Sequence, residues 1–427
     1  MTFESSFCSS PWLHMRINNA GNYEYCRWIA NKNANIKNAN IKNTTPTEYF
    51  QQHMAPIRQA MLAGETVPGC SECAQMEQHS KISGRQRQLL KIGVRTDQFA
   101  KTLASSPWVA EFANDLNGHT DQLPQDWQID LGNYCNSGCV FCSPNSSSKL
   151  AAEYKKLGLL TQEPPPNWTD DPSLVQKFLD TLTQSPHIQY LHFIGGETVI
   201  TPAFKTILEA LITAGLHRTA TIGFTTNLTV WRDDIAELLI QFQNVNAGMS
   251  VESFKTSNDY ARWPSSLPTV FENMDRWIKL GQEHNWLMQF RTTPTILTVG
   301  DLLTVHDYAW NNNIPVESCN FLQRPEFLRA SVLPLHLRTA IISRMREWLN
   351  VHAADSQQVI NTRNPSFAKT QVVQDLESYV SYLEKEPDES WRLPDLIKYL
   401  KQLESNRGNC VLTYLPEYEE LFRTAGY

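Results

Sequence analysis

Three cysteines stand close together after a short apolar run, and their number and spacing indicate a metal centre. Cys135, Cys139 and Cys142 are separated by three and then two residues. Thiolates are soft ligands that suit iron–sulfur clusters and zinc, and a loop this short can direct all three at one centre. A cluster of four irons held by three protein ligands leaves one iron open for a small molecule, whereas structural zinc normally takes four ligands. Three buried thiols without a metal are the weaker alternative, because clustered cysteines at ligand spacing are seldom accidental.

A second group of cysteines lies in the first hundred residues. Cys8 and Cys26 are followed by Cys70 and Cys73, and Gly21 permits the tight turn that a ligand loop before Cys26 needs. Four thiolates are a complete ligand set for one further centre. We favour an iron–sulfur cluster, and a structural zinc ion stays open because ligand type alone does not decide between them.

The composition describes a protein with a large buried core. A length of 427 residues predicts two or three domains, and 41% of the residues are hydrophobic. The formal net charge of −7 argues against a general nucleic-acid binder, whose surface is usually basic. We expect no membrane span and no signal segment, because no long apolar run occurs. Grouped cysteines then favour metal ligation in a reducing cytoplasm over disulfides.

Strand-like and helical runs alternate between about residues 125 and 330. The strand-like runs are 127–131, 188–194, 219–226, 246–251, 287–293 and 316–322. Apolar stripes predict helices that begin at Pro172 and Pro202, and a further one near 270–278. The alternation predicts a parallel sheet wrapped by helices, and six repeats suit a partial (β/α)6 barrel. Pro164 to Pro166 predict a loop in the first crossover, and the pattern after about residue 330 is helical.

Polar and glycine residues follow the predicted strands at their carboxyl ends, where parallel α/β barrels place their chemistry. They are Gly195, Gly196 and Glu197 after the second strand, Thr226 and Asn227 after the third, Ser250 and Glu252 after the fourth, and Arg262 further on. Missing side chains at the glycine pair would let a ligand approach the backbone. Singly, these residues also suit a turn, a helix cap or a surface ion pair. Their joint order behind the cysteine loop favours one site.

The cysteine spacing, with aromatic Phe141 before the last cysteine, resembles the signature of the radical S-adenosylmethionine (SAM) superfamily. This resemblance implies a partial barrel in which Cys135, Cys139 and Cys142 hold a [4Fe–4S] cluster whose open iron takes SAM. One electron, from a donor such as flavodoxin or ferredoxin, would split SAM into methionine and a 5′-deoxyadenosyl radical. The radical would abstract hydrogen from a substrate.

The resemblance also implies roles for the residues at the strand ends. Gly195-Gly196-Glu197 is similar to the family's GGE motif, which holds the amino group of SAM, and Thr226-Asn227 to the element beneath the nucleoside. Ser250 and Glu252 stand where relatives have a Ser-x-Asp that contacts the ribose, and the glutamate is a departure that puts its role in doubt. Arg262 matches an arginine that pairs with the SAM carboxylate.

The amino-terminal cysteines are similar to twitch and SPASM auxiliary-cluster domains, which implies a second auxiliary [4Fe–4S] cluster. The departure is in order, because here they precede the barrel. We therefore predict three parts: an auxiliary-cluster domain over 1–100, a radical SAM core barrel over 125–330, and a helical region over 331–427.

We predict a cytoplasmic radical SAM enzyme whose substrate is a ribosomally made peptide, by analogy with members that carry auxiliary clusters. A tailoring enzyme for a nucleotide, sugar or cofactor precursor is the alternative within the enzyme class. A non-catalytic iron–sulfur or redox-sensing protein is the alternative outside it. The sequence leaves the reaction outcome and the substrate-facing catalytic residues open.

Overall fold

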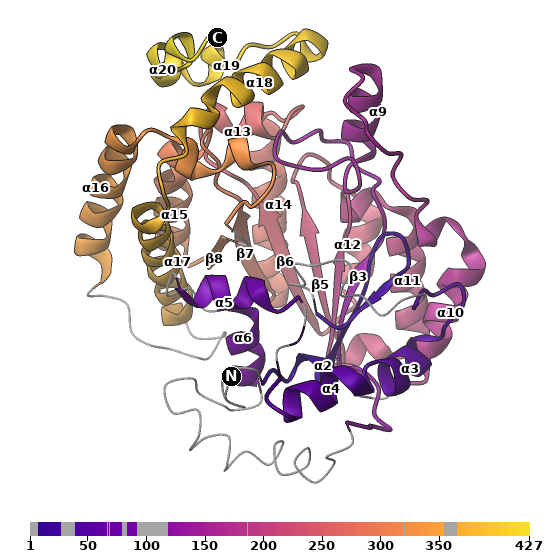
Figure 1. The fold of residues 1–427 in the computed structure, drawn as a ribbon. Coiled ribbons are helices and arrows are strands. Elements are labelled where there is room, and N and C mark those ends of the chain that lie inside the picture. Colours follow the sequence, from indigo (N-terminus) through magenta and orange to yellow (C-terminus); the bar gives the residue numbers. More distant parts are fainter. Residues whose placement is uncertain are drawn as a thin grey trace.

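One sheet of eight strands organises the molecule (Figure 1). The computed structural model describes residues 7–26, 39–65, 67, 69–78, 83–91, 118–185, 187–318, 321–353 and 365–427. The strands are β1 (His14–Ile17), β2 (Tyr23–Glu24), β3 (Asp126–Asp130), β4 (Tyr190–Ile194), β5 (Thr221–Thr226), β6 (Asn244–Ser250), β7 (Leu287–Thr292) and β8 (Val316–Ser318). Their order is β2-β1-β3-β4-β5-β6-β7-β8, and only the β1–β2 pair is antiparallel.

Strands β3 to β8 confirm the predicted α/β class and follow the chain in the predicted order. Each begins within a few residues of its predicted run, for example at Leu287 for β7. The last strand ends at Ser318, and residues 319–320 of its predicted run lie outside the described residues. The mostly parallel sheet is consistent with a partial barrel.

The sequence did not predict β1 and β2. Strand β1 lies parallel to β3, with Met15 opposite Trp127, so residues near the first cysteine belong to the same sheet as the barrel strands. The predicted division between the first two parts, residues 100–125, falls mainly in a stretch outside the described residues.

Alternate side chains along each strand point to opposite faces of the sheet. Buried Trp127, Phe193, Phe224 and their alternate neighbours point to the outer side. There they meet α10 (Pro172–Thr183), α11 (Pro202–Thr213), α12 (Asp233–Leu239), α14 (Leu267–His284) and α15 (Leu302–Asn312), which lie along this side in Figure 1. The ring of Trp127 packs edge-on against Phe178 of α10, and Phe224 contacts Phe204 of α11.

Helix starts follow the predicted signals. Asp171 caps α10 by accepting a hydrogen bond from the N–H of Ser173 at 2.9 Å, and Pro172 occupies the first turn. Helix α11 also has a proline, Pro202, in its first turn, but its N-cap residue Thr201 makes no side-chain capping hydrogen bond. Both helices are thus fixed against the outer face of the sheet, and the carboxyl ends of the strands are left for other residues.

The carboxyl-terminal part is helical, as predicted. It contains α16 (Leu335–His352), α17 (Pro365–Lys385), α18 (Leu393–Arg407), α19 (Val411–Tyr414) and α20 (Glu419–Thr424). Figure 1 places α18 to α20 beyond the carboxyl ends of the strands, near α13 (Thr256–Ala261).

Shorter helices belong to the amino-terminal segment and the first crossover. They are α2 (Ser10–Leu13), α3 (Pro46–Glu48), α4 (Ala55–Leu62), α5 (Ser71–Gln78), α6 (Gly84–Lys91) and α9 (Ser148–Lys156). Among the described residues, no helix is long and apolar enough to cross a membrane.

Candidate active site

The cysteine loop follows β3 at the carboxyl edge of the sheet. Cys139 is buried, and Cys135 and Cys142 are half-buried. Burial, together with the neighbouring thiol of Cys139, raises the pKa of Cys135 and of Cys142 to about 12. The three sulfurs therefore lie within electrostatic range of one another.

The donor set fits a metal centre in its chemistry, because the three thiols are soft donors that form no disulfide in the described part of the chain. Metal ligation would remove the thiol protons, so the raised pKa values belong to the metal-free loop. Within the described ranges, no three His, Cys, Asp or Glu side chains are close enough to hold a metal ion. The ligand assignment of these cysteines therefore stays a prediction.

The backbone of the loop is fixed by its neighbours. Cys135 donates its N–H to the hydroxyl of Ser148 at 3.1 Å. The hydroxyl of Ser147 donates to the carbonyl of Ser137 at 2.6 Å and caps α9 by accepting from Leu150. The start of α9 therefore holds the loop from one side.

The glycine pair after β4 lies directly against the cysteine loop. A Cβ atom at Gly195, whose φ is +155°, would lie 2.8 Å from the carbonyl oxygen of Gly132. One at Gly196 would lie 2.8 Å from the carbonyl carbon of Asn133 and nearer still to the oxygen of Tyr134. Gly196 donates its N–H to Gly132 at 2.9 Å. The missing side chains thus make room for the protein's own loop, whereas we had expected them to make room for a ligand.

Glu197 joins the ends of β4 and β5. Its side chain is buried and accepts a hydrogen bond from the backbone N–H of Asn227 at 2.6 Å. Burial raises the pKa of Glu197 to about 7, although this hydrogen bond and one from the Thr226 side chain act in the opposite direction. The carboxyl group is therefore poised to titrate near neutral pH.

Asn227 extends this network into the cysteine loop. Its side-chain nitrogen donates to Oδ1 of Asn136 at 2.9 Å and to the hydroxyl of Ser137 at 3.0 Å. Thr226 is buried beside it. The structure thus brings together Glu197, Thr226, Asn227 and the loop, as the strand-end argument predicted.

Glu252 and Arg262 pair with each other. The Glu252 carboxylate is fully buried and accepts from Nε of Arg262 at 3.0 Å and from the N–H of Thr293 at 2.6 Å. The Arg262 guanidinium lies 5.4 Å from the ring centre of Phe141. Ser250 ends β6 next to Arg291 of β7. Sequence reasoning missed this ion pair, which joins two of the predicted SAM contacts.

Three of the four amino-terminal thiols lie near one another. Burial, together with the thiols of Cys73 and Cys70, raises the pKa of Cys8 to about 12. Cys70 shares a hydrogen bond with the side chain of Tyr25, next to Cys26. The segment also reaches the barrel, because Arg87 of α6 forms an ion pair with Glu317 of β8. The geometry is that of a compact cysteine group beside the sheet, and its metal stays a prediction.

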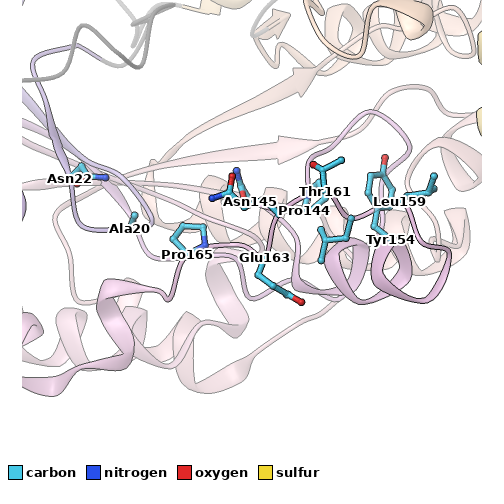
Figure 2. A pocket seen from close by; sticks show the side chains of 11 residues that line it. Ala20, Asn22, Pro144, Asn145, Tyr154, Leu159, Thr161, Glu163 and Pro165 are labelled. Atoms are coloured by element: carbon cyan, nitrogen blue, oxygen red, sulfur yellow. The ribbon is translucent and has the colours of Figure 1, made fainter.

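A pocket of about 520 Å³ lies beside the loop that follows Cys142. Figure 2 shows Ala20 and Asn22 at one end, Asn145 and Pro165 in the middle, and Tyr154 and Leu159 at the other end. Pro165 of the predicted proline loop is among the residues that line the pocket, next to residues 159–163. Sequence reasoning missed the pocket because its lining comes from three separate segments.

Residues 129–300 match the family model described as Radical SAM superfamily. The matched stretch is about 40% of the 427 residues and contains the cysteine loop, the three strand-end motifs and Arg262. The chain therefore carries a radical SAM domain, which supports an enzyme and leaves its reaction unspecified. That superfamily implies a [4Fe–4S] cluster and SAM.

Solved structures to which the chain is similar include SuiB of Streptococcus suis bound to S-adenosylmethionine. The identity is 15% and the TM-score is 0.35, and the similarity covers 69% of this chain and 63% of SuiB. Native anSMEcpe with bound AdoMet is 13% identical, with a TM-score of 0.40. This similarity covers 54% of this chain and 62% of the anSMEcpe chain. The chain thus spans less than two thirds of either protein, and TM-scores this low carry no argument about activity. No curated protein sequence matches the chain.

Proposed function

We propose that Cys135, Cys139 and Cys142 hold the [4Fe–4S] cluster and that SAM binds beside it. When bound, the two cofactors would supply a 5′-deoxyadenosyl radical, which abstracts a hydrogen atom from the substrate. The observation that carries this proposal is the convergence of the cysteine loop with Glu197 and Asn227 at one edge of the sheet.

Glu197 is the proposed partner of the SAM amino group. Its carboxyl is buried with a pKa of about 7, so an approaching ammonium would favour the ionised form. The position of Glu197 relative to the cysteine loop would be fixed by its neighbours Gly195, Gly196, Thr226 and Asn227.

Arg262 is the proposed partner of the SAM carboxylate. Glu252 already takes its Nε and Nη2 atoms, so a bound carboxylate would meet the remaining Nη1. Glu252 would then orient the arginine rather than touch the ribose, and Ser250 is the proposed ribose contact. Phe141 supports the guanidinium from its ring face.

For the substrate we propose a peptide that enters by the pocket beside Cys142. The amide side chains of Asn22, Asn145 and Gln162 can exchange hydrogen bonds with peptide groups, and Pro144 and Leu159 offer apolar contact. The pocket volume of about 520 Å³ lies within the range for ligand sites. The phosphates of a nucleotide would need cationic side chains, whereas Glu163, an anion, is the one charged residue among those that line the pocket.

The amino-terminal group is proposed as the second centre. Cys8, Cys26, Cys70 and Cys73 would bind an auxiliary [4Fe–4S] cluster in a domain over residues 1–100, beside a core over 125–330 and a helical region over 331–427. Flavodoxin or ferredoxin in the cytoplasm would supply the electron.

Anaerobic assays test the proposal. Reconstituted protein with dithionite and SAM should release 5′-deoxyadenosine and methionine, and joint replacement of Cys135, Cys139 and Cys142 by Ala should abolish release. Cys410→Ala, outside both cysteine groups, is the matched control. Undiminished release from the triple variant would contradict the assignment, and iron binding without SAM cleavage would leave a non-catalytic iron–sulfur protein.

A further inference from the structure

Helix α18 of the carboxyl-terminal region reaches the cysteine loop at two carbonyl groups. Nη2 of Arg407 donates to the carbonyl of Gly138 at 2.7 Å, and the hydroxyl of Tyr399 donates to the carbonyl of Val140 at 2.7 Å. Gly138 and Val140 lie immediately on either side of Cys139. The contacts join parts of the chain that are more than 250 residues apart.

The N–H groups of the same two residues are also bonded. Gly138 donates to the carbonyl of Trp263 at 2.6 Å, and Val140 donates to that of Ala261 at 2.8 Å. All four backbone groups that flank Cys139 are therefore fixed, the N–H groups by the last residue of α13 and by Trp263 just beyond it, and the carbonyls by α18.

Arg407 is itself held rigidly. It forms a two-bond ion pair with Glu153 of α9, at 2.9 Å from Nε and 2.6 Å from Nη2, and both side chains are almost fully buried. Its guanidinium lies 4.7 Å from the ring centre of Trp263. Such a pair keeps a positive charge in one place, because separating buried partners is costly.

One nitrogen of this guanidinium has no partner among the described residues. Nη1 of Arg407 is buried and makes no hydrogen bond with the described residues. An unpaired buried donor is costly unless an acceptor arrives. Arg407 also acts on the Cys139 thiol, whose pKa burial raises and the positive charges of Arg262 and Arg407 lower.

A second anchor fixes α18 one turn earlier. The Glu404 carboxylate accepts from the hydroxyl of Tyr260 in α13 at 2.8 Å and from that of Tyr427 at 2.8 Å. Tyr399 is held as well: because its own proton goes to Val140, its oxygen accepts from Tyr154 of α9 at 2.9 Å. The helix is thus tied to both elements that flank the loop.

We propose that Arg407 and Tyr399 are positioning residues for the cluster, and that the buried charge of Arg407 raises its reduction potential. The inference rests on the proposed [4Fe–4S] site. Reduction adds a negative charge, so a fixed neighbouring cation favours the reduced state, and net charge is among the factors that set cluster potentials. Tyr399 supplies a hydrogen bond without a charge and should affect retention of the cluster rather than its potential.

Redox titration followed by electron paramagnetic resonance tests the charge. Because a second cluster is proposed at the amino terminus, the signal of the barrel cluster is identified as the one that disappears in Cys142→Ala. Arg407→Gln should lower the equilibrium constant for reduction by roughly tenfold, which is about 59 mV for one electron. Glu153→Gln, which leaves the cation without its counter-charge, should shift the potential upward. A residue that only packs the helix would not give shifts of opposite sign.

Tyr399→Phe tests the hydrogen bond to Val140. We expect the reduction potential of the cluster to be unchanged and the loss of iron to a chelator to be several-fold faster. Tyr308→Phe, on α15, is the control. Equal potentials in wild type, Arg407→Gln and Glu153→Gln would overturn the charge role, and unchanged iron loss in Tyr399→Phe would overturn the positioning role. Should Arg407→Gln not fold, Glu153→Gln alone decides, since a potential equal to wild type also refutes the charge role. A wild type without a [4Fe–4S] signal would instead refute the proposed function.

Discussion

Replacing Gly196 by Ala should displace the cysteine loop. The added Cβ would lie 2.8 Å from the carbonyl carbon of Asn133, against the 3.4 Å at which ordinary contact begins, and nearer still to the Tyr134 oxygen. The obstacle is backbone, so no side-chain rotation can relieve it. Overpacking of this kind costs about 1–3 kcal/mol.

The displacement would also strain two hydrogen bonds. Gly196 donates to Gly132 at 2.9 Å, and Glu197 donates to Tyr134 at 2.7 Å. Each is worth about 0.5–1.5 kcal/mol, so the loss of unfolding free energy should total about 2–6 kcal/mol. Because Cys135 follows Tyr134 directly, the iron content after reconstitution should fall as well.

Gly215→Ala is the control for this variant. Gly215 has a φ of +79° and no atom within 4 Å of its would-be Cβ, so alanine there should cost only about 1–2 kcal/mol of backbone strain. Chemical denaturation and iron analysis of both variants would measure the difference. If Gly196→Ala binds iron and unfolds like Gly215→Ala, then the glycine pair is not needed to admit the loop, and the reasoning fails.

The remaining predictions concern charge and metal. Burial raises the pKa of Glu197 from its ordinary 4.5 to about 7. The protonated carboxyl therefore contributes its full stabilisation below pH 4.5, and this stabilisation is lost as the pH rises through 7. In Glu197→Gln, the denaturation midpoint should vary less with pH over this range. The same variant should weaken SAM binding roughly ten- to a hundredfold in calorimetry without loss of iron. Joint Ala replacement of Cys8, Cys26, Cys70 and Cys73 should lower the iron from about eight to about four per chain, whereas a zinc site would give about four in the wild type. Glu252→Gln should leave Arg262 buried without its anion and reduce the unfolding free energy by about 3–5 kcal/mol.

The barrel strands could be predicted because each leaves a local signal. Runs such as 219–226 and 287–293 are apolar or alternating, and proline marks the helix starts at Pro172 and Pro202. Strand β1 has four residues and pairs with β3 more than a hundred positions later. No local pattern specifies so distant a partner, and the amino-terminal segment was therefore read as separate from the sheet.

The site was predictable in its residues and not in their partners. Strand ends meet at one edge of a parallel sheet, which is enough to expect Glu197 and Asn227 near the cysteine loop. Glu252 and Arg262 were read as two independent contacts for SAM, yet they bond to each other. The carboxylate with which a guanidinium pairs depends on burial and distance, and neither can be read from the spacing of residues in the sequence.

Arg407 illustrates the same limit in a way that bears on function. In the sequence it is a basic residue in the last turn of a helix, where a positive charge suits the helix dipole. Buried Leu396, Leu400 and Leu403 explain why α18 packs, but they do not say where its end points. Only the fold brings that end to the carbonyl of Gly138. Removal of the carboxyl-terminal region would therefore leave the carbonyl groups on both sides of Cys139 without these hydrogen bonds, so this region belongs to the proposed active site as much as the barrel does.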